Sequence, residues 1–225
     1  MQENTFRLLE NYKLSCMKDS AHDKEHIYRV LYGAMEIAKT EKMVDYDVLI
    51  GSCLLHDIAR KEQFENPKLC HALVGSEKAY EFLLKNGFSK EYAERVKCCI
   101  ATHRYRKNRS PESTEAKILF DSDKLDAVGV MGMARALIYI GNISVPMYNV
   151  LESGEVSDGS KDNEPSFFKE YKYKLENLYS YFYTLRGKQL AEERQTAAID
   201  FYNNLYCEAS RLYEIGKSEM KKVIV

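Results

Sequence analysis

Apolar residues recur at helical spacing along almost the whole chain, and runs that alternate as a β-strand would are hard to find. The clearest case follows an S-x-x-D capping signal at Ser20 and Asp23 and continues to about Lys42. Its apolar positions recur at i, i+3, i+4 and i+7 and form one helical face: Ile27, Val30, Leu31, Ala34, Ile37 and Ala38. Residues 45–59 are apolar on most sides, which is typical of a central helix. The pattern predicts an all-α fold.

The same periodicity predicts the domain organisation. Further helices are expected at about 4–17, 69–85, 89–103 and 113–128, with a short one ending near Ile140. Residues 141–165 are rich in Gly, Ser, Asp and Asn, and a connection of this length is usually a lid or a mobile segment. Two helices follow, with a break expected at Arg186-Gly187. We expect one domain over residues 1–225, namely a core at about 20–140, a mobile loop at about 141–165 and a helical pair at about 166–214.

Charge and composition exclude several classes of protein. The 33 Lys and Arg residues nearly cancel the 34 Asp and Glu residues, so no global field marks a nucleic-acid or membrane-surface binder. The N-terminal residues contain no apolar signal segment and no long apolar run occurs, so we expect neither secretion nor a membrane span. The six cysteines include no CxxC pair, and reduced thiols fit a cytoplasmic protein. Either a monomer or a homodimer is compatible with these features.

The pair His56-Asp57 interrupts the apolar run from Val48 to Ile58. A buried imidazole and carboxylate need partners, and a bound cation is one way to compensate the carboxylate. His26 and Asp123, on two other amphipathic segments, are candidate partners. Two imidazoles and two carboxylates suit a divalent ion such as Mn, Co, Ni, Fe, Mg or Zn and leave positions open for water. Metal-assisted hydrolysis of a phosphate ester or anhydride is the natural chemistry of such a site.

Helical geometry sorts the neighbours of these residues. Positions i and i+3 share a face, whereas i and i+2 point in nearly opposite directions. Asp126 is therefore expected beside Asp123, where it either supports a metal ligand or faces the substrate, while Asp121 points elsewhere. Arg29 shares a face with His26 and could reach an anionic group bound near the metal.

Five motifs occur in a fixed order along the chain and carry a family resemblance. They are HDKEHIYRV, LLHDIAR, HALVGSEKA, ATHR and EAKILFDSDKLDAVGVMGMARA, and LRGKQLAEER follows them. Together they resemble the HD-domain metal-dependent phosphohydrolase superfamily, more specifically its bacterial YedJ/YpgQ-like subgroup, over roughly residues 20–210. The resemblance implies an all-helical fold, a metal held by His26, His56, Asp57 and Asp123, and hydrolysis of nucleotides. Some relatives cleave nucleoside triphosphates to the monophosphate and pyrophosphate.

The resemblance leaves three interpretations of the remaining site residues open. It places His71 and His103 where related enzymes hold either phosphate-binding groups or ligands of a second metal. With one metal, these two histidines, Arg29 and Arg104 stabilise phosphate charge, and Asp126 orients the water or accepts its proton. The second interpretation is a two-metal phosphodiesterase or nucleotidase, in which Asp57 bridges the ions. The third is a non-catalytic module that binds metal or nucleotide. The expected partner is a small phosphorylated molecule, most simply a nucleotide, and no nucleic acid.

Overall fold

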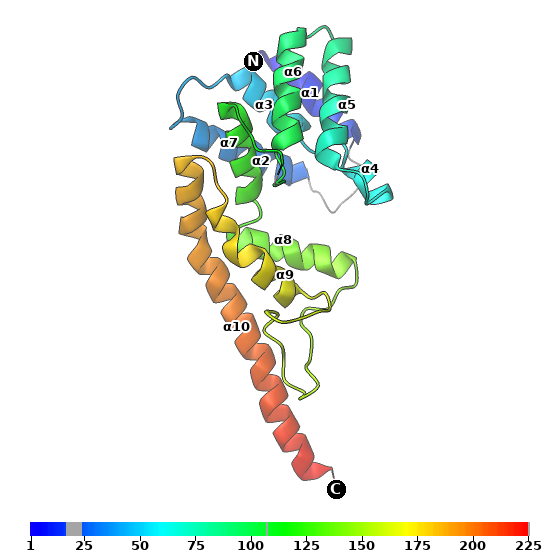
Figure 1. Cartoon of the computed structure of the whole chain (residues 1–225), viewed down its shortest axis with the longest axis vertical. Helices are drawn as coiled ribbons and strands as arrows, with labels where there is room; N and C mark the ends of the chain where they lie inside the picture. Colours follow the sequence, from blue (N-terminus) through cyan, green and yellow to red (C-terminus); the bar gives the residue numbers. More distant parts are fainter. Residues whose placement is uncertain (17–23, 107, 225) are drawn as a thin grey trace. The chain divides into compact units, whose positions relative to one another are not determined.

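The computed structural model describes residues 1–16, 24–106 and 108–224, and these residues contain helices but no β-strand (Figure 1). One isolated antiparallel bridge joins Val150 and Val156. The prediction of an all-α fold is confirmed. The capping signal at Ser20 and Asp23 lies outside the described residues. Across the described part of the chain, no helix combines the length and the apolar character needed to cross a bilayer.

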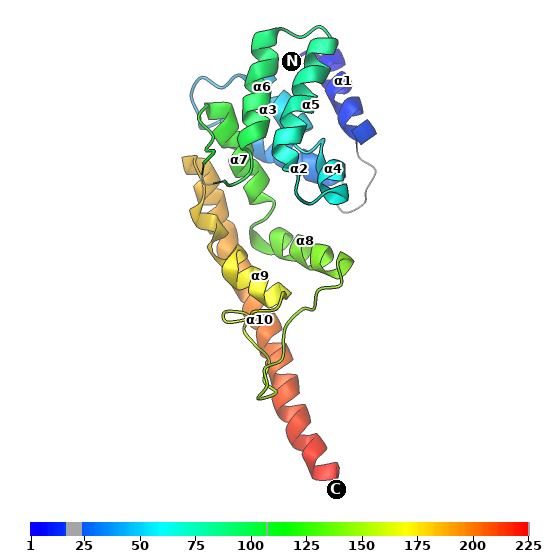
Figure 2. The same cartoon turned by 45° about the vertical axis from the view of Figure 1, so that its right-hand side comes forward.

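The chain divides into two compact units, Met1–Asp126 with Phe182–Gly187, and Ala127–Tyr181 with Lys188–Val225. A single domain over the whole chain stays a prediction. The first unit contains α1 (Glu3–Cys16), α2 (Lys24–Ala38), α3 (Tyr46–Leu55), α4 (Arg60–Glu65), α5 (His71–Lys85), α6 (Lys90–Thr102) and α7 (Thr114–Leu125). In this unit α5 and α6 run side by side (Figures 1 and 2).

Helix α3 is the centre of the first unit, as its apolar pattern predicts. It packs against α1, α2, α6 and α7. The side chain of Asp45 caps its N-terminus by accepting hydrogen bonds from the backbone N–H groups of Asp47 and Val48. Burial of nearly every side chain along α3 removes apolar surface from water, which is the main favourable contribution to folding.

Helix α3 ends at Leu55, earlier than the sequence pattern predicts, and His56-Asp57 lie in the turn that follows. The ring nitrogen Nδ1 of His56 donates to the carbonyl oxygen of Cys53 at 2.8 Å. In a continuing α-helix, that carbonyl would accept from the backbone N–H of Asp57. The backbone instead goes on with i to i+3 bonds, from Ile58 to Leu55 and from Arg60 to Asp57. The prediction of a helix to Ala59 is therefore wrong, and the site begins where α3 ends.

The second unit contains α8 (Gly129–Asn142), α9 (Phe167–Tyr173), the 3-10 helix η1 (Leu175–Ser180) and most of α10 (Leu185–Val223). Residues 143–166 form neither helix nor strand, which agrees with the predicted loop. Helix α9 packs on α10 through aromatic side chains, and the rings of Tyr171 and Tyr202 stack with centroids 4.0 Å apart.

The expected helix break at Arg186-Gly187 is wrong, because α10 begins at Leu185 and runs through Gly187. Gly187 instead allows a close contact between two segments of the chain. A Cβ atom at this position would lie 2.6 Å from Oδ2 of Asp121 and 2.7 Å from Oγ1 of Thr184. The backbone N–H of Gly187 also donates to Oγ1 of Thr184 at 3.0 Å. Glycine is thus required for the close approach of the first turn of α10 to α7.

Candidate metal centre

The candidate site residues lie at the ends of helices in the first unit. His56, His103 and Asp126 are the C-cap residues of α3, α6 and α7. His71 is the first residue of α5, and His26 lies in the first turn of α2. The C-terminal end of a helix carries partial negative charge, so three helix ends of this kind favour a cation among them. All five side chains are buried.

The four predicted ligands converge on one point. Nε2 of His26 lies 3.4 Å from Nε2 of His56, 3.6 Å from Oδ2 of Asp57 and 3.5 Å from Oδ1 of Asp123. Nε2 of His56 lies 3.6 Å and 3.9 Å from the same two carboxylate oxygens. The structure therefore brings together His26, His56, Asp57 and Asp123, which we call the first donor group.

A second donor group lies on the other side of Asp57. The second oxygen of Asp57, Oδ1, lies 3.4 Å from Nε2 of His71 and 3.6 Å from Nε2 of His103. The two histidine nitrogens are 3.2 Å apart. Each oxygen of Asp57 thus faces one donor group, and the groups share this carboxylate.

Hydrogen bonds fix the tautomers of the four histidines. Nδ1 of His26 donates to Asp126 Oδ2 at 2.6 Å, and Nδ1 of His103 donates to the carbonyl of Ile100 at 2.6 Å. Nδ1 of His71 donates to Oε1 of Gln63, whose amide nitrogen donates to the Leu69 carbonyl, and Nδ1 of His56 donates to Cys53 as described above. With the proton on Nδ1, each Nε2 presents a lone pair.

This protonation pattern makes both donor groups electron-rich. Two Nε2 lone pairs face each other in each group, and the neighbouring carboxylate oxygens are also acceptors. No hydrogen bond can form between such atoms. Neither oxygen of Asp57 has a hydrogen-bond partner in the described part of the chain, although the ion pair with Nε of Arg60 is 2.9 Å long. A buried carboxylate in this state is costly unless a cation compensates it. His26, His56 and Asp123 lie close enough together to hold a divalent ion, and so do Asp57, His71 and His103.

The pKa shifts agree with a cation site. Burial lowers the pKa of His56 to about 3 and that of His71 to about 2, so both rings are neutral near pH 7. Burial disfavours the ionised form of Asp57, but Arg60 and the neighbouring histidines hold the pKa of this carboxyl well below its usual range. Burial also opposes ionisation of Asp123, and Lys124 with the histidines lowers its pKa in the same way. Neutral imidazoles and ionised carboxylates are the forms that bind metals.

His26 differs from the other histidines. Burial disfavours its charged form, yet the hydrogen bond with Asp126 and the nearby carboxylates of Asp57 and Asp123 raise its pKa above the ordinary value. The negative charge of these carboxylates, which favours a proton on His26, favours a divalent cation in the same way.

Asp126 lies behind His26, on the side of the ring away from the first donor group. Its Oδ2 accepts from Nδ1 of His26, and Arg29 donates to Oδ1 from Nε at 2.6 Å and to Oδ2 from a terminal nitrogen at 3.1 Å. Asp126 thus contacts the ring of His26 on the side away from the other donors, and a carboxylate in this place orients the imidazole and increases its basicity. A direct part for Asp126 in orienting water stays a prediction, as does phosphate binding by Arg29.

One cationic side chain, Arg104, lies beside the second donor group. Arg104 is half-buried, and one guanidinium nitrogen lies 3.4 Å from Nδ1 of His71. Sequence reasoning missed Gln63, which orients His71, and the buried Lys13 of α1. A signal for Lys13 exists in the sequence, because it lies four residues after Leu9 on the face of α1 that is buried.

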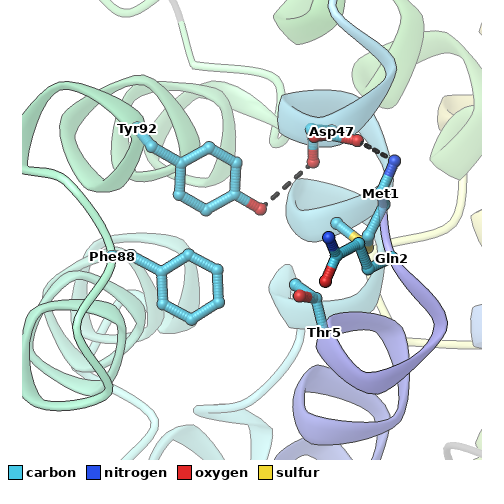
Figure 3. Close-up of a pocket in the computed structure, with 6 residues that line it drawn as sticks. All are labelled: Met1, Gln2, Thr5, Asp47, Phe88 and Tyr92. Carbon is cyan, nitrogen blue, oxygen red and sulfur yellow. Dashed lines mark hydrogen bonds and ion pairs between the residues drawn. The ribbon is translucent and has the colours of Figure 1, made fainter.

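A pocket of about 300 Å³ lies elsewhere in the first unit (Figure 3). It is lined by Met1, Gln2, Thr5, Asp47, Phe88 and Tyr92, and the hydroxyl of Tyr92 donates to the carbonyl of Asp47 at 3.1 Å. Asp47 lies in the first turn of α3, whereas His56 follows its last turn. The pocket contains no residue of either donor group.

Residues 24–128 match the HD domain family, and this segment contains both donor groups and Asp126. The matched segment covers just under half of the chain. The chain is 29% identical over 192 residues to the uncharacterized protein YpgQ of Bacillus subtilis, with 84% of each chain covered.

Solved structures agree with this assignment. The crystal structure of B. subtilis YpgQ in complex with ADP is similar with a TM-score of 0.68 and 25% identity, over 89% of this chain and 97% of that chain. A predicted HD-superfamily hydrolase from an uncultured Thermotogales bacterium is similar with a TM-score of 0.61 and 28% identity, over 90% and 91% of the two chains. The chain is thus similar in fold to B. subtilis YpgQ and to a predicted HD-superfamily hydrolase.

Proposed function

We propose that this protein is a metal-dependent phosphohydrolase that acts on nucleotides. The observation that carries the proposal is the carboxylate of Asp57, buried without a hydrogen-bond partner in the described residues and facing histidine lone pairs. His26, His56, Asp57 and Asp123 would hold the cation. A divalent ion bound there supplies an acidified water and polarises a phosphoryl oxygen.

The residues around the ligands have separate roles in the proposal. Asp126 holds His26 in the tautomer that presents Nε2. Arg104 offsets the negative charge of a phosphate group beside the cation. The complex of YpgQ with ADP supports a nucleotide as the substrate. Release of pyrophosphate from a nucleoside triphosphate is the reaction we propose first.

Purified protein is expected to release phosphate or pyrophosphate from nucleotides only when a divalent ion is present. The measurement is a screen of nucleoside mono-, di- and triphosphates with Mn, Co, Mg and Ni, with chelator as the control. If calorimetry shows that nucleotides bind but no product forms with any ion, the chain is a binding module and the proposed activity is wrong.

The second donor group favours a second candidate, a two-metal phosphodiesterase or nucleotidase. The Nε2 atoms of His71 and His103 lie near Oδ1 of Asp57. The Nε2 atoms of His26 and His56 lie near Oδ2 at similar distances. A carboxylate that faces two donor groups can bridge two cations, which together stabilise the attacking and leaving oxygens of a displacement at phosphorus.

Elemental analysis separates the two candidates. With two cations, wild-type protein contains two equivalents of metal per chain and His103→Ala contains one, because loss of one imidazole leaves the second donor group with two ligands. His71→Ala is the matched variant and should give the same result. One equivalent in all three proteins contradicts the two-metal candidate and leaves His71 and His103 as phosphate-binding groups.

A further inference from the structure

Gln63 of α4 makes two hydrogen bonds that leave its side chain in a single orientation. Helix α4 packs against α5, of which His71 is the first residue (Figure 2). The amide nitrogen of Gln63 donates to the carbonyl of Leu69 at 2.9 Å, and the side-chain oxygen Oε1 contacts Nδ1 of His71. A carbonyl only accepts hydrogen bonds, so the amide nitrogen must face Leu69 and Oε1 must face the ring. An oxygen in this place requires a proton on Nδ1.

Other neighbours of the His71 ring favour the opposite tautomer. One guanidinium nitrogen of Arg104, which can only donate, lies 3.4 Å from Nδ1. On the other side of the ring, Oδ1 of Asp57 and the Nε2 lone pair of His103 lie 3.4 Å and 3.2 Å from Nε2, and both can accept. A lone pair on Nδ1 and a proton on Nε2 would suit all three groups. The contact with Gln63 opposes them and keeps the proton on Nδ1.

The tautomer of His71 decides which ligand the second donor group can take. Burial lowers the pKa of His71 to about 2, so the ring carries one proton in either tautomer. With this proton on Nδ1, the group consists of three acceptors within 3.6 Å of one another, namely Nε2 of His71, Nε2 of His103 and Oδ1 of Asp57. The oxygens of an ionised phosphate are acceptors too and would be repelled, whereas a divalent cation suits all three atoms. With the proton on Nε2, His71 could donate to a phosphate but could not bind a metal through this nitrogen.

We infer that Gln63 is a positioning residue that assigns the second donor group to a cation. Its oxygen holds His71 with Nε2 unprotonated, so Nε2 can bind a metal and cannot donate to a phosphate. Gln63 acts through His71, because it contacts Nδ1 whereas the donor group contains Nε2. The inference rests on the proposed function in its two-metal form, and it names a residue on which binding of the second cation depends.

Gln63→Leu tests the inference when metal-free protein is titrated with Mn in a calorimeter. Leucine keeps much of the apolar volume and offers no acceptor, so His71 can take the tautomer with the proton on Nε2. Affinity for the second equivalent of Mn should fall about 10- to 100-fold, as for other groups that orient a metal-bound histidine. Affinity for the first equivalent should stay unchanged. Gln63→Ala gives the same comparison if Gln63→Leu does not fold.

Nuclear magnetic resonance of the metal-free protein reports the tautomer itself. Correlation spectra between ring nitrogens and ring protons distinguish a protonated nitrogen from one with a lone pair, and the chain has five histidines to resolve. In wild type the proton of His71 should be on Nδ1, and in Gln63→Leu it should be on Nε2. The spectrum of His71→Ala identifies the signals.

Two further variants separate this role from a structural one. Gln63→Glu keeps an acceptor oxygen for Nδ1 of His71 but cannot donate to the carbonyl of Leu69, so it should keep the wild-type tautomer and bind the second Mn. Asn66→Ala is the matched control in the turn between α4 and α5, where the side-chain oxygen of Asn66 accepts from the backbone N–H of Lys68 at 3.2 Å. Its loss should leave the affinity for both equivalents of Mn unchanged.

The inference and the proposed function can fail separately. Wild-type affinity for the second Mn in Gln63→Leu overturns the inference, and so does an unchanged tautomer. Equal loss of the second Mn in Gln63→Glu and Gln63→Leu also overturns it, because it shows that the bond to Leu69 is what matters. One equivalent of Mn in wild type overturns it and leaves the one-metal phosphohydrolase in place. If wild type binds two equivalents in a Gln63-dependent way but hydrolyses no phosphate compound, the proposed function is wrong and the assignment of Gln63 stands.

Discussion

Asp57→Ala is expected to lose both the bound cation and divalent-dependent hydrolysis. Asp57 is the residue that both donor groups share, so its removal takes one ligand from each. Lewis-acid stabilisation by a metal is worth several kcal/mol, so kcat should fall by about 10³-fold or more. Activity assays with Mn and elemental analysis of the purified variant measure the two losses.

The amount of folded protein separates loss of the metal site from general damage to the fold in Asp57→Ala. Loss of Asp57 also removes the ion pair with Arg60, so metal content and activity are compared per folded molecule. Asp126→Asn is the graded comparison, because it weakens the support of His26 without removing a ligand. The loss in metal affinity or activity should then be about 10- to 100-fold. Full activity in Asp57→Ala is incompatible with the proposed mechanism.

Asp121→Ala is expected to destabilise the fold and to spare the site, although Asp121 is two residues from Asp123 on the same helix. The buried carboxylate of Asp121 accepts hydrogen bonds from the backbone N–H groups of Tyr183 and Thr184 and from the Thr184 hydroxyl, at 2.6 to 2.9 Å. Its removal leaves these donors unsatisfied, so the free energy of unfolding should fall by about 2–4 kcal/mol. Urea unfolding measures this loss.

Asp123→Ala is the matched variant and should show the reverse result. The folded protein should keep most of its stability and lose metal affinity, because Asp123 contributes an oxygen to the first donor group. Metal content per folded molecule of Asp121→Ala should equal that of wild type. If Asp121→Ala loses metal and keeps its stability, the assignment of the two aspartates is reversed.

The opposite roles of Asp121 and Asp123 were predictable from helical geometry. Residues two apart point in nearly opposite directions, and the structure directs Asp121 to the start of α10 and Asp123 to His26. The helices of the first unit were predictable for a similar reason, because their apolar positions repeat with the helical period. The motif order then identified the segment that matches the HD family.

Other features depend on contacts between distant residues, which a single sequence does not display. The end of α3 depends on the bond from His56 to Cys53, which a periodic pattern cannot reveal. Gly187 looks like a helix break until its distance to Asp121 is known. Each oxygen of Asp57 faces a different donor group only because separate helices pack together. The burial of Lys13 has the same origin.

We propose that one cation is held by His26, His56, Asp57 and Asp123, and anomalous diffraction from crystals grown with Mn would locate it. We expect a peak about 2.0–2.3 Å from Nε2 of both histidines and from one oxygen of each aspartate. A catalytically active protein whose anomalous density lies elsewhere, or that shows none at this position, would show that these four residues do not hold the cation.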